Sequence, residues 1–326
     1  MGEQPLNQAA GYVMNWTVPL VSEGTRLDAF LRVLLPHLSL RQLRKTVAEG
    51  AFRVNQSRVG KKGDIVFEGD VISYHGPAGL LTAEVPARYA ANVVIVYEDA
   101  SLLVVEKPPG MPCHGFSPKE TNSLVNHLVA IRPDVKRIGK SPWEPGLVHR
   151  LDRETSGLIL VAKNRAAFDR LRAQFRSRLV QKRYWALVWG NTAAEGFIDY
   201  PLLHDTRDRR RMKALVNMAD HPRERKWTAF TRYRTVAQNR DVSLVEVEMV
   251  TGVMHQIRAH LAAIGHPLVG DSLYGPEQYL SLPLGRHFLH AFFLACRHPE
   301  NGAMLSWESP LPQDLRAILQ AVKMLV

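Results

Sequence analysis

The sequence predicts an α+β protein with two domains. One is a small N-terminal α/β domain, and the other is a larger domain with a mixed, largely antiparallel sheet. Three observations support this fold class. The chain has 326 residues and is 46% hydrophobic, which is long for one domain and apolar enough for a sizeable core. Two helical patterns precede short strands near the N-terminus. From residue 93 onward strands outnumber helices, which is typical of an α+β domain.

The predicted small domain spans residues 22–75. It follows residues 1–21, which carry little pattern and are expected to form an extension. Leucine and phenylalanine recur at helical spacing in residues 27–34. The spacing from Ser39 to Gln42 is that of a capping box, so a second helix is predicted to begin there.

Gly50 is well suited to end that second helix, because glycine adopts the left-handed conformation at low cost. Strands are predicted at residues 52–55 and 64–74, with a turn at Gly69 inside the second segment. Residues 76–92 contain several Gly, Pro and Ala residues and are interpreted as a linker.

The larger domain is predicted to span residues 93–326. Asn164 is placed to cap a helix with an apolar stripe, and another helix is predicted from His255 to Gly265. Its clearest strands are short runs rich in β-branched and aromatic residues, at 93–97, 102–107, 157–163, 183–189 and 242–250. Valine and methionine alternate with glutamate in the last of these strands, so one of its faces is expected to be exposed to solvent.

The charge balance favours a polyanionic partner. Lys plus Arg number 42 and Asp plus Glu number 31, which gives a net charge of +11 at pH 7. Nucleic acid is the first candidate for so basic a chain. No amphipathic anchor, lipidation signal or bilayer-spanning apolar run accompanies the charge, so no membrane partner is expected.

Neither a disulfide scaffold nor a metal site is predicted. The two cysteines, Cys113 and Cys296, are far apart in sequence and form no CxxC pattern. His255 and His260 are five residues apart, which separates them by about 140° around a helix and does not match a metal-binding pair. The N-terminus also lacks the pattern of a signal peptide. We therefore expect a monomeric, cytoplasmic protein.

Asp152 is the first candidate for chemistry. It lies before a strongly apolar strand, between Arg150 and Arg153, and a Thr-Ser-Gly turn is expected after it. A carboxylate beside cations stays ionised, which suits a nucleophile or a base at neutral pH. Taken by itself, however, this pattern fits a structural ion pair or a hydrogen bond to the turn better than it fits catalysis.

Three further residues can serve the same site. Arg258 is predicted on a short helix from which it can reach an anion or Asp152. Lys107 ends a strand before a stiff Pro-Pro-Gly turn, which either presents it to a pocket or is a plain strand exit. Tyr184 lies on a strand and can stack on a base, although most strand tyrosines belong to the core.

Three segments, in this order, resemble the motifs of the RluA-type pseudouridine synthase family. They are YEDASLLVVEKPPGMPCH (97–114), HRLDRETSG (149–157) and TGVMHQIRAHLAAIGHPLVGDSLYG (251–275), and LHA at 289–291 also fits. The resemblance covers nearly all of residues 93–315. One departure is visible: the family usually reads Thr-Gly-Arg-Thr-His-Gln-Ile-Arg, and Val253-Met254 replace its Arg-Thr. We expect this change to alter RNA contacts without abolishing catalysis.

Residues 22–74 resemble the S-four-like RNA-binding domain, through RLDAFLRVLLPHLSLRQLRKTVAEGAFRVN and EGDVI. This resemblance implies that Arg41, Arg44 and Lys45 contact RNA. Their spacing alone fits a solvated helix face equally well.

The family resemblance implies an isomerase that needs no cofactor or metal. It breaks the N-glycosidic bond of a uridine, rotates the uracil and rejoins it through carbon. Asp152 is then the catalytic carboxylate, acting on the ribose or on the base, and Arg258 pairs with it. Tyr184 stacks on the uracil, and Lys107 supports the pocket.

The resemblance also implies an RNA partner whose target base leaves its stack. Arg150 is expected to fill the vacated space, with His149 and Arg153 as neighbouring RNA contacts. Ribosomal RNA is favoured over transfer RNA. The basic runs at 165–178 and 204–213 either follow phosphates or are solvated.

Two other functions remain open on the sequence. A catalytically silent RNA-binding or ribosome-assembly factor would use the same architecture, with Asp152 in a structural role. A nuclease or glycosidase would need a second acid or a metal-ligand cluster, and the sequence offers neither convincingly.

Overall fold

The computed structural model divides the chain into two compact units, the first mainly up to Pro86 and the second mainly from Ala87 onward. The structure describes residues 12–19, 22, 24–35, 38–58, 63–76, 85–115, 120–141, 143–208, 210–217, 226–275 and 284–324. None of the helices in these ranges has both the length and the hydrophobicity that a bilayer crossing requires.

The first unit contains both predicted helices. These are α1 (Leu27–Leu34) and α2 (Leu40–Ala48). The Ser39 hydroxyl accepts a hydrogen bond from the Gln42 amide at 3.2 Å, and the Gln42 side chain accepts one from the Ser39 amide at 2.8 Å. This reciprocal pair is the predicted capping box, and Gly50 follows the helix with a φ of +74°.

The strands of this unit correct one prediction. Its four-stranded sheet has the order β1-β6-β3-β4, and a separate pair joins β2 to β5. Strand β1 comes from the segment expected to be an extension, because Trp16 and Val18 pack into the core of the unit. The bounds are β1 (Tyr12–Thr17), β2 (Thr25–Arg26), β3 (Phe52–Val54), β4 (Ser57–Arg58), β5 (Ile65–Val66) and β6 (Val71–Gly76).

The predicted linker, residues 76–92, is described only in part. Its last residues belong to the second unit. The Arg88 amide donates to the carbonyl of Asn126 at 2.9 Å, and the Ala90 amide donates to His127 Nδ1 at 3.0 Å. These contacts place the start of the larger unit a few residues before the predicted boundary at residue 93.

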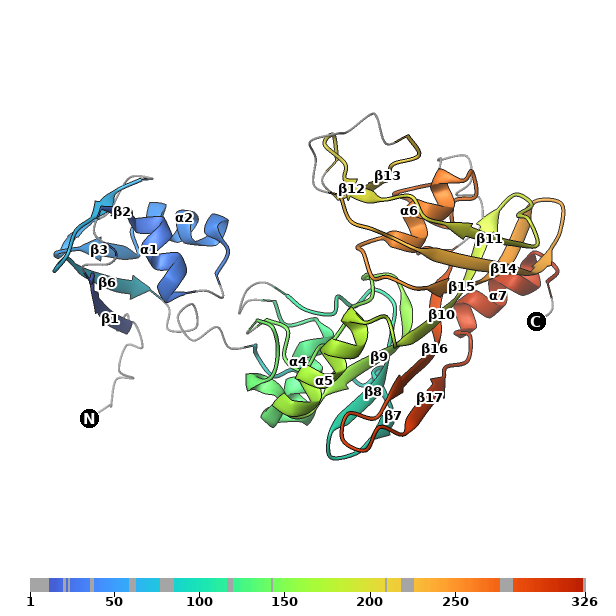
Figure 1. The fold of residues 1–326 in the computed structure, drawn as a ribbon, viewed down its shortest axis with the longest axis horizontal. Coiled ribbons are helices and arrows are strands. Elements are labelled where there is room, and N and C mark those ends of the chain that lie inside the picture. The colour runs from blue at the N-terminus through green and yellow to red at the C-terminus, as the bar shows by residue number, and fades with distance from the viewer. Residues whose placement is uncertain are drawn as a thin grey trace, which may run out of the picture. The chain divides into compact units, whose positions relative to one another are not determined.

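The second unit is built on a nine-stranded sheet in the order β11-β14-β15-β10-β16-β9-β8-β7, with β17 also paired to β16 (Figure 1). All pairings within it are antiparallel except that of β9 with β16, which makes the sheet mixed, as predicted. Hairpin β12–β13 forms its own small sheet. The bounds are β7 (Val94–Glu98), β8 (Leu102–Lys107), β9 (Ser156–Ala162), β10 (Gln181–Trp189), β11 (Glu195–Ile198), β12 (Leu202–His204), β13 (Met212–Ala214), β14 (Thr231–Gln238), β15 (Val242–Met249), β16 (Leu289–Arg297) and β17 (Met304–Glu308).

The parallel contact between β9 and β16 depends on a glycine. Gly157 has a φ of +116°, and a Cβ atom there would lie 2.3 Å from the carbonyl oxygen of Ala291. Of the predicted Thr-Ser-Gly turn, Ser156 and Gly157 are instead the first residues of β9. The turn comes earlier, where the Thr155 amide donates to the carbonyl of Asp152 at 3.2 Å. This turn fixes the backbone of Asp152 directly before β9.

Helices cover parts of the sheet. In Figure 1, α4 and α5 lie beside β8 and β9, and α7 lies near the C-terminus of the chain. Asn164 caps α5 as predicted, accepting a hydrogen bond from the Ala167 amide at 2.8 Å. Apolar side chains of α7 pack on β10 and β15. The helices are α4 (Leu124–Ile131), the 3₁₀ turn η2 (Pro133–Arg137), α5 (Arg165–Arg176), α6 (Gln256–Ala263) and α7 (Gln313–Ala321).

Candidate active site

Asp152 and Arg258 meet although 106 residues separate them. Arg258 Nη1 donates to Asp152 Oδ2 at 3.1 Å. His255 precedes α6 with a φ of +54°, and its Nε2 lies 3.8 Å from the same carboxylate oxygen. Left-handed backbone is costly for a residue with a side chain, and such strain is concentrated at functional sites. The predicted partnership of Asp152 and Arg258 is thus present in the structure.

Asp271 is a second carboxylate partner of Arg258, and it was not predicted as a site residue from the sequence. It accepts from Arg258 Nε at 2.7 Å and from Nη2 at 2.8 Å, and its side chain is fully buried. Burial alone would raise the pKa of Asp271, but the hydrogen bonds and charge of Arg258 outweigh that effect and lower it. Burial likewise opposes the charged form of Arg258, yet the two carboxylates raise its pKa overall. Arg258 is therefore held rigidly, and its Nη1 is left to donate to Asp152.

Lys107 supports the turn at Asp152 rather than facing a substrate. Its side chain is fully buried. Nζ donates to the carbonyls of Pro108, Met111 and Arg153 at 2.7, 2.9 and 2.9 Å, which uses all three ammonium hydrogens. Burial lowers the pKa of Lys107 to about 8. Lys107 therefore connects the loops on either side of the site, and a direct part in catalysis stays a prediction.

Tyr184 lies on β10, opposite Ala291 of β16, and is 2% exposed. Burial raises the pKa of its phenol, and the nearby charge of Asp152 raises it further. The phenol is thus neutral at physiological pH and is a poor proton acceptor. Its ring is better suited to a face-on contact with a flat ligand than to proton removal.

Arg150 is available to a ligand. Its side chain is half exposed, and Nη1 donates to His114 Nε2 at 2.8 Å. Glu144 lies 4.0 Å from the same Arg150 nitrogen and 3.4 Å from the His114 ring. Arg153 is also exposed, with Nε donating to the Gly110 carbonyl at 2.9 Å. Both arginines can leave these contacts for an RNA phosphate or base.

His149 is reassigned from RNA contact to support of the fold. Its Nε2 accepts a hydrogen bond from the Leu160 amide at 2.9 Å, and its ring stacks on Phe175 at 4.9 Å between centroids. Burial lowers the pKa of His149 to about 3. The ring is therefore neutral, and its acceptor nitrogen is committed to β9.

Buried neutral histidines predict a loss of stability in mild acid. Burial lowers the pKa to about 3 for His149 and His287 and to about 4 for His290. The unfolded chain binds more protons than the folded one below pH 6.5, so stability is present above that pH and is lost as the pH falls toward 4. These three groups alone should cost about 4 kcal/mol of stability between pH 7.0 and 5.5 in urea denaturation. Burial also lowers the pKa of His127, His255 and His260, which adds to the loss.

The variant His149→Gln should reduce this loss by about 1 kcal/mol, because one of the proton-linked groups is removed. Gln can still accept from the Leu160 amide. His204→Gln, at an exposed position, serves as the control substitution. An unchanged pH dependence in His149→Gln would contradict the assignment of His149 as a buried neutral group.

The three cations of α2 differ in their availability. Arg44 Nε donates to the buried carboxylate of Asp28 at 2.7 Å, which Arg26 also contacts. Arg41 is exposed, and Lys45 forms only a loose surface pair with Glu49 at 3.7 Å. Arg44 thus has a structural partner, whereas Arg41 and Lys45 can contact RNA at little cost.

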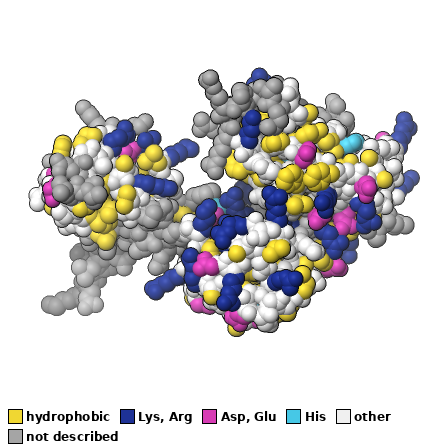
Figure 2. Space-filling view, viewed as in Figure 1, with side chains coloured by type: hydrophobic (Ala, Val, Ile, Leu, Met, Phe, Trp, Pro, Cys, Tyr) yellow, Lys and Arg dark blue, Asp and Glu magenta, His cyan; other side chains and the backbone are white. Residues whose placement is uncertain are grey.

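The arginines along α5 also differ in whether they have structural partners. Arg170 and Arg172 donate to the carbonyls of Pro299 and Val148, so they tie the helix to neighbouring loops. Arg165 pairs with Asp169 at the surface, and Arg176 is exposed. Figure 2 shows Lys and Arg side chains gathered in a band across the middle of the larger unit. The surface therefore offers positive charge even though several arginines have structural contacts.

Val253 and Met254 have an apolar environment. Both pack against a cluster that includes Leu202 of β12 and Met212 of β13. These side chains therefore fasten the β12–β13 hairpin to the start of α6. The altered pair in the third motif has a packing role and leaves the Arg258–Asp152 contact intact.

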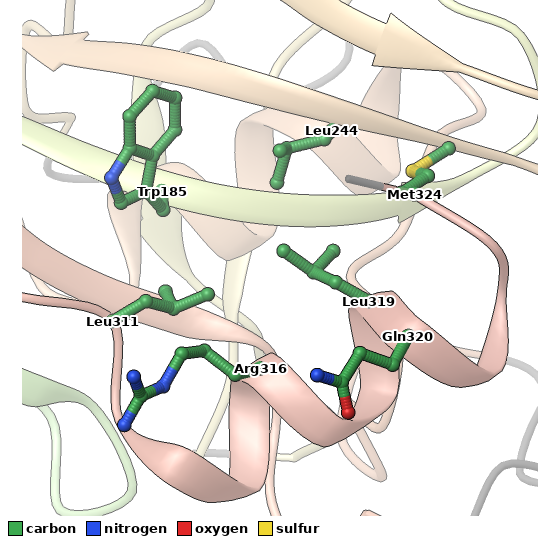
Figure 3. A pocket seen from close by; sticks show the side chains of 7 residues that line it. All are labelled: Trp185, Leu244, Leu311, Arg316, Leu319, Gln320 and Met324. Carbon is green, nitrogen blue, oxygen red and sulfur yellow. The ribbon is translucent and has the colours of Figure 1, made fainter. Parts of the chain in front are cut away.

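A separate apolar cavity of about 330 Å³ lies between the sheet and α7 (Figure 3). It does not include Asp152, Arg258 or Tyr184. Its lining consists of Trp185, Leu244, Leu311, Arg316, Leu319, Gln320 and Met324.

The arrangement around Asp152 suits chemistry with a single carboxylate. Arg258 donates a hydrogen bond to that group, and the phenol of Tyr184 lies near it. Asp271, the other carboxylate of this ion-pair chain, is bound through both oxygens by Arg258 and is fully buried. It is not placed to act as the second acid that a glycosidase needs.

Comparisons with known proteins agree with this geometry. Residues 101–263 match the family model of RNA pseudouridylate synthase, and residues 25–72 match that of the S4 domain. An uncharacterized RNA pseudouridine synthase of Chloroflexus aurantiacus is 38% identical over 99% of this chain and 97% of its own length. The ribosomal large subunit pseudouridine synthase D of Neisseria meningitidis is 34% identical over 94% of this chain and 81% of its own.

Solved structures of RNA pseudouridylate synthases share this fold. Human RNA pseudouridylate synthase domain containing 1 superposes with a TM-score of 0.55 at 26% identity, covering 71% of this chain and 95% of that one. Human RNA pseudouridylate synthase domain containing 4 gives 0.54 at 25% identity, covering 71% and 94%. With its central sheet, its S4 domain and relatives that match almost its whole length, the chain belongs to the RluA-type family of RNA pseudouridine synthases.

Proposed function

We propose that Asp152 is the catalytic carboxylate and that the substrate is large-subunit ribosomal RNA. One observation carries the role of Asp152. Arg258 is buried, is fixed through two donors by Asp271, and directs its remaining contact to Asp152. Such an arrangement aims a fixed guanidinium at one carboxylate, which is the property that an electrostatically preorganised site requires.

The reaction that fits this site balances without any external reactant. The bond between ribose C1′ and uracil N1 breaks, the uracil rotates, and a bond forms between C1′ and C5. The proton on C5 leaves, and N1 gains one. Asp152 assists by attacking the ribose or the base, or by stabilising the charge that develops between the two steps. Tyr184 holds the uracil face while it turns.

The target uridine has to leave its stack to reach Asp152, since the carboxylate is enclosed by protein on several sides. Arg150 is the group proposed to occupy the vacated position. It follows the buried Val148 closely in sequence and is half exposed, and among the described residues its side chain contacts His114 and Glu144. Its planar guanidinium can stack between bases and pair with phosphate.

Ribosomal RNA is proposed because several similar proteins carry that substrate in their names, including those of Neisseria meningitidis and Yersinia pestis. The test is incubation of the full chain with protein-free large-subunit ribosomal RNA and, separately, with bulk transfer RNA. Pseudouridines are then mapped by carbodiimide modification and primer extension. New sites in the ribosomal RNA alone are expected. New sites confined to transfer RNA would overturn this substrate.

The S4 domain is proposed to contribute salt-dependent RNA affinity. The double variant Arg41→Ala/Lys45→Ala should weaken binding and reduce the slope of log K against log salt by about 1 to 2, because up to two phosphate contacts are lost. Arg44 is left intact, since its removal would disturb the buried Asp28. Filter binding at several salt concentrations measures the slope.

The control for this experiment is Arg240→Ala/Arg316→Ala, which removes two exposed cations from the other unit. Its salt slope should equal that of the unmodified chain. If both double variants show that unmodified slope, the S4 domain does not contact phosphates through these side chains.

A further inference from the structure

A pair of aromatic rings, one exposed and one partly buried, lies at the edge of the large sheet. Phe197 belongs to β11, the strand that ends the sheet order, and is 54% exposed. Its ring stacks on that of Phe230, with centroids 5.8 Å apart and planes inclined by 14°.

Two arginines accompany the pair. The Arg232 guanidinium lies 5.7 Å from the centroid of Phe197, and that of Arg178 lies 5.1 Å from the centroid of Phe230. Arg232 is also 3.7 Å from Glu248, which takes up part of its charge. In the described part of the chain no carboxylate lies within ion-pair distance of Arg178, so its charge is available to a ligand.

The backbone of Arg178 supports a role beyond folding. Helix α5 ends in a Schellman motif, in which the Leu179 amide donates to the Gln174 carbonyl and the Arg178 amide donates to that of Phe175. Arg178 occupies the left-handed position, with a φ of +59°. Glycine is favoured there because it has no Cβ atom, so an arginine weakens the fold locally. A ligand contact would explain why a cation stands at that position.

Hydrogen bonds connect this surface to the active site. The Phe230 amide donates to Thr251 Oγ1 at 2.8 Å, and its carbonyl accepts from Gln256 Nε2 at 2.9 Å. Gln256 is the first residue of α6, two positions before Arg258. The aromatic pair is therefore fixed relative to the helix that holds Asp152 in place.

We propose that Phe197, Phe230, Arg178 and Arg232 form a stacking platform for an unpaired base of the substrate RNA next to the modified uridine. Every nucleobase has a flat face that stacks on an aromatic ring, and guanidinium groups beside the ring bind the adjoining phosphates. An apolar protein partner would match the two rings but not the unpaired charge of Arg178. The proposal rests on the proposed function, since it assumes an RNA substrate with single-stranded nucleotides near the target.

The test uses the full chain and a fluorescein-labelled single-stranded oligouridine of about 12 nucleotides, with an RNA duplex of equal length as the second probe. Phe197→Leu removes the ring and keeps an apolar side chain. Arg178→Gly removes the cation and relieves the backbone strain, so its Tm should equal or exceed that of the unmodified chain. Each variant should bind the single strand about 5-fold or more weakly and the duplex almost normally.

A 5-iodouridine version of the single strand adds a direct readout, because the excited base forms a covalent bond with an aromatic ring that it contacts. Irradiation should link it to Phe197 or Phe230, as located by mass spectrometry. Arg240→Gly, at an exposed position in the turn between β14 and β15, is the matched control and should bind both probes normally.

The platform is refuted if both variants bind the single strand like the control, or if they lose the single strand and the duplex equally. Neither outcome touches the role of Asp152, because binding is measured without turnover. Conversely, full activity of an Asp152 variant would remove the proposed catalytic role and leave the binding result standing.

Discussion

Asp152→Asn is expected to abolish pseudouridine formation, with a loss of at least ~10³-fold in kcat/KM. The amide has the size and shape of the carboxylate but carries no charge and cannot act as a nucleophile. Arg258 still has an acceptor in the Asn side-chain oxygen, so the loop before β9 should keep its position. RNA affinity should therefore change little, because the substitution removes chemistry and leaves the binding surface.

Tritium release from RNA labelled at uracil C5 measures this loss, and filter binding of the same RNA measures affinity. Asp169→Asn is the matched control. It makes the same chemical change at an exposed position on α5, where Asp169 pairs with Arg165. Normal tritium release by Asp152→Asn would remove Asp152 from the mechanism. A large loss of affinity in Asp152→Asn alone would mean that its effect is on binding.

Asp271→Ala is expected to have the second largest effect, on stability as well as activity. Asp271 is fully buried and binds Arg258 through both oxygens. Its removal leaves a buried guanidinium with only the partly exposed Asp152 as a partner, and breaking a buried pair in this way costs about 3–5 kcal/mol. The free energy of unfolding should fall by that amount, and the remaining folded enzyme should turn over slowly.

Urea denaturation measures the first effect, and tritium release at a temperature where the variant is folded measures the second. Asp169→Ala, which removes an exposed carboxylate paired with Arg165, should leave the free energy of unfolding unchanged within error. Asp271→Asn separates positioning from folding, since it fills the same space and keeps one acceptor. Stability close to normal with strongly reduced kcat would show that Asp271 aims Arg258. Unimpaired kcat would refute that role.

Local patterns in the sequence were sufficient for the elements that local interactions determine. The capping box at Ser39, the cap at Asn164 and the left-handed Gly50 depend on neighbours within a few residues, and all three are found. The motif resemblance located Asp152 and Arg258 correctly relative to each other. The spacing of residues alone could not predict this contact, because it joins two segments that are distant in sequence.

The features that the sequence did not reveal depend on distant partners. Gly157 looks like a turn residue until Ala291 is known to lie against it. Lys107 looks like a ligand group until three carbonyls are seen to occupy its ammonium group. A usable signal did exist for Asp271. A buried arginine needs more than one acceptor, and Asp271 is the acidic residue that follows Arg258 in the third motif.

The position of β16 determines when this enzyme can first assemble during its synthesis. β16 lies between β9 and β10 in the sheet but is formed by residues 289–297, near the end of the chain. Until the ribosome has released that segment, β9 and β10 each have one edge without a partner strand. All seven residues of β9 are buried in the complete fold. Incomplete chains therefore expose two unpaired strand edges, which favour aggregation until β16 is in place.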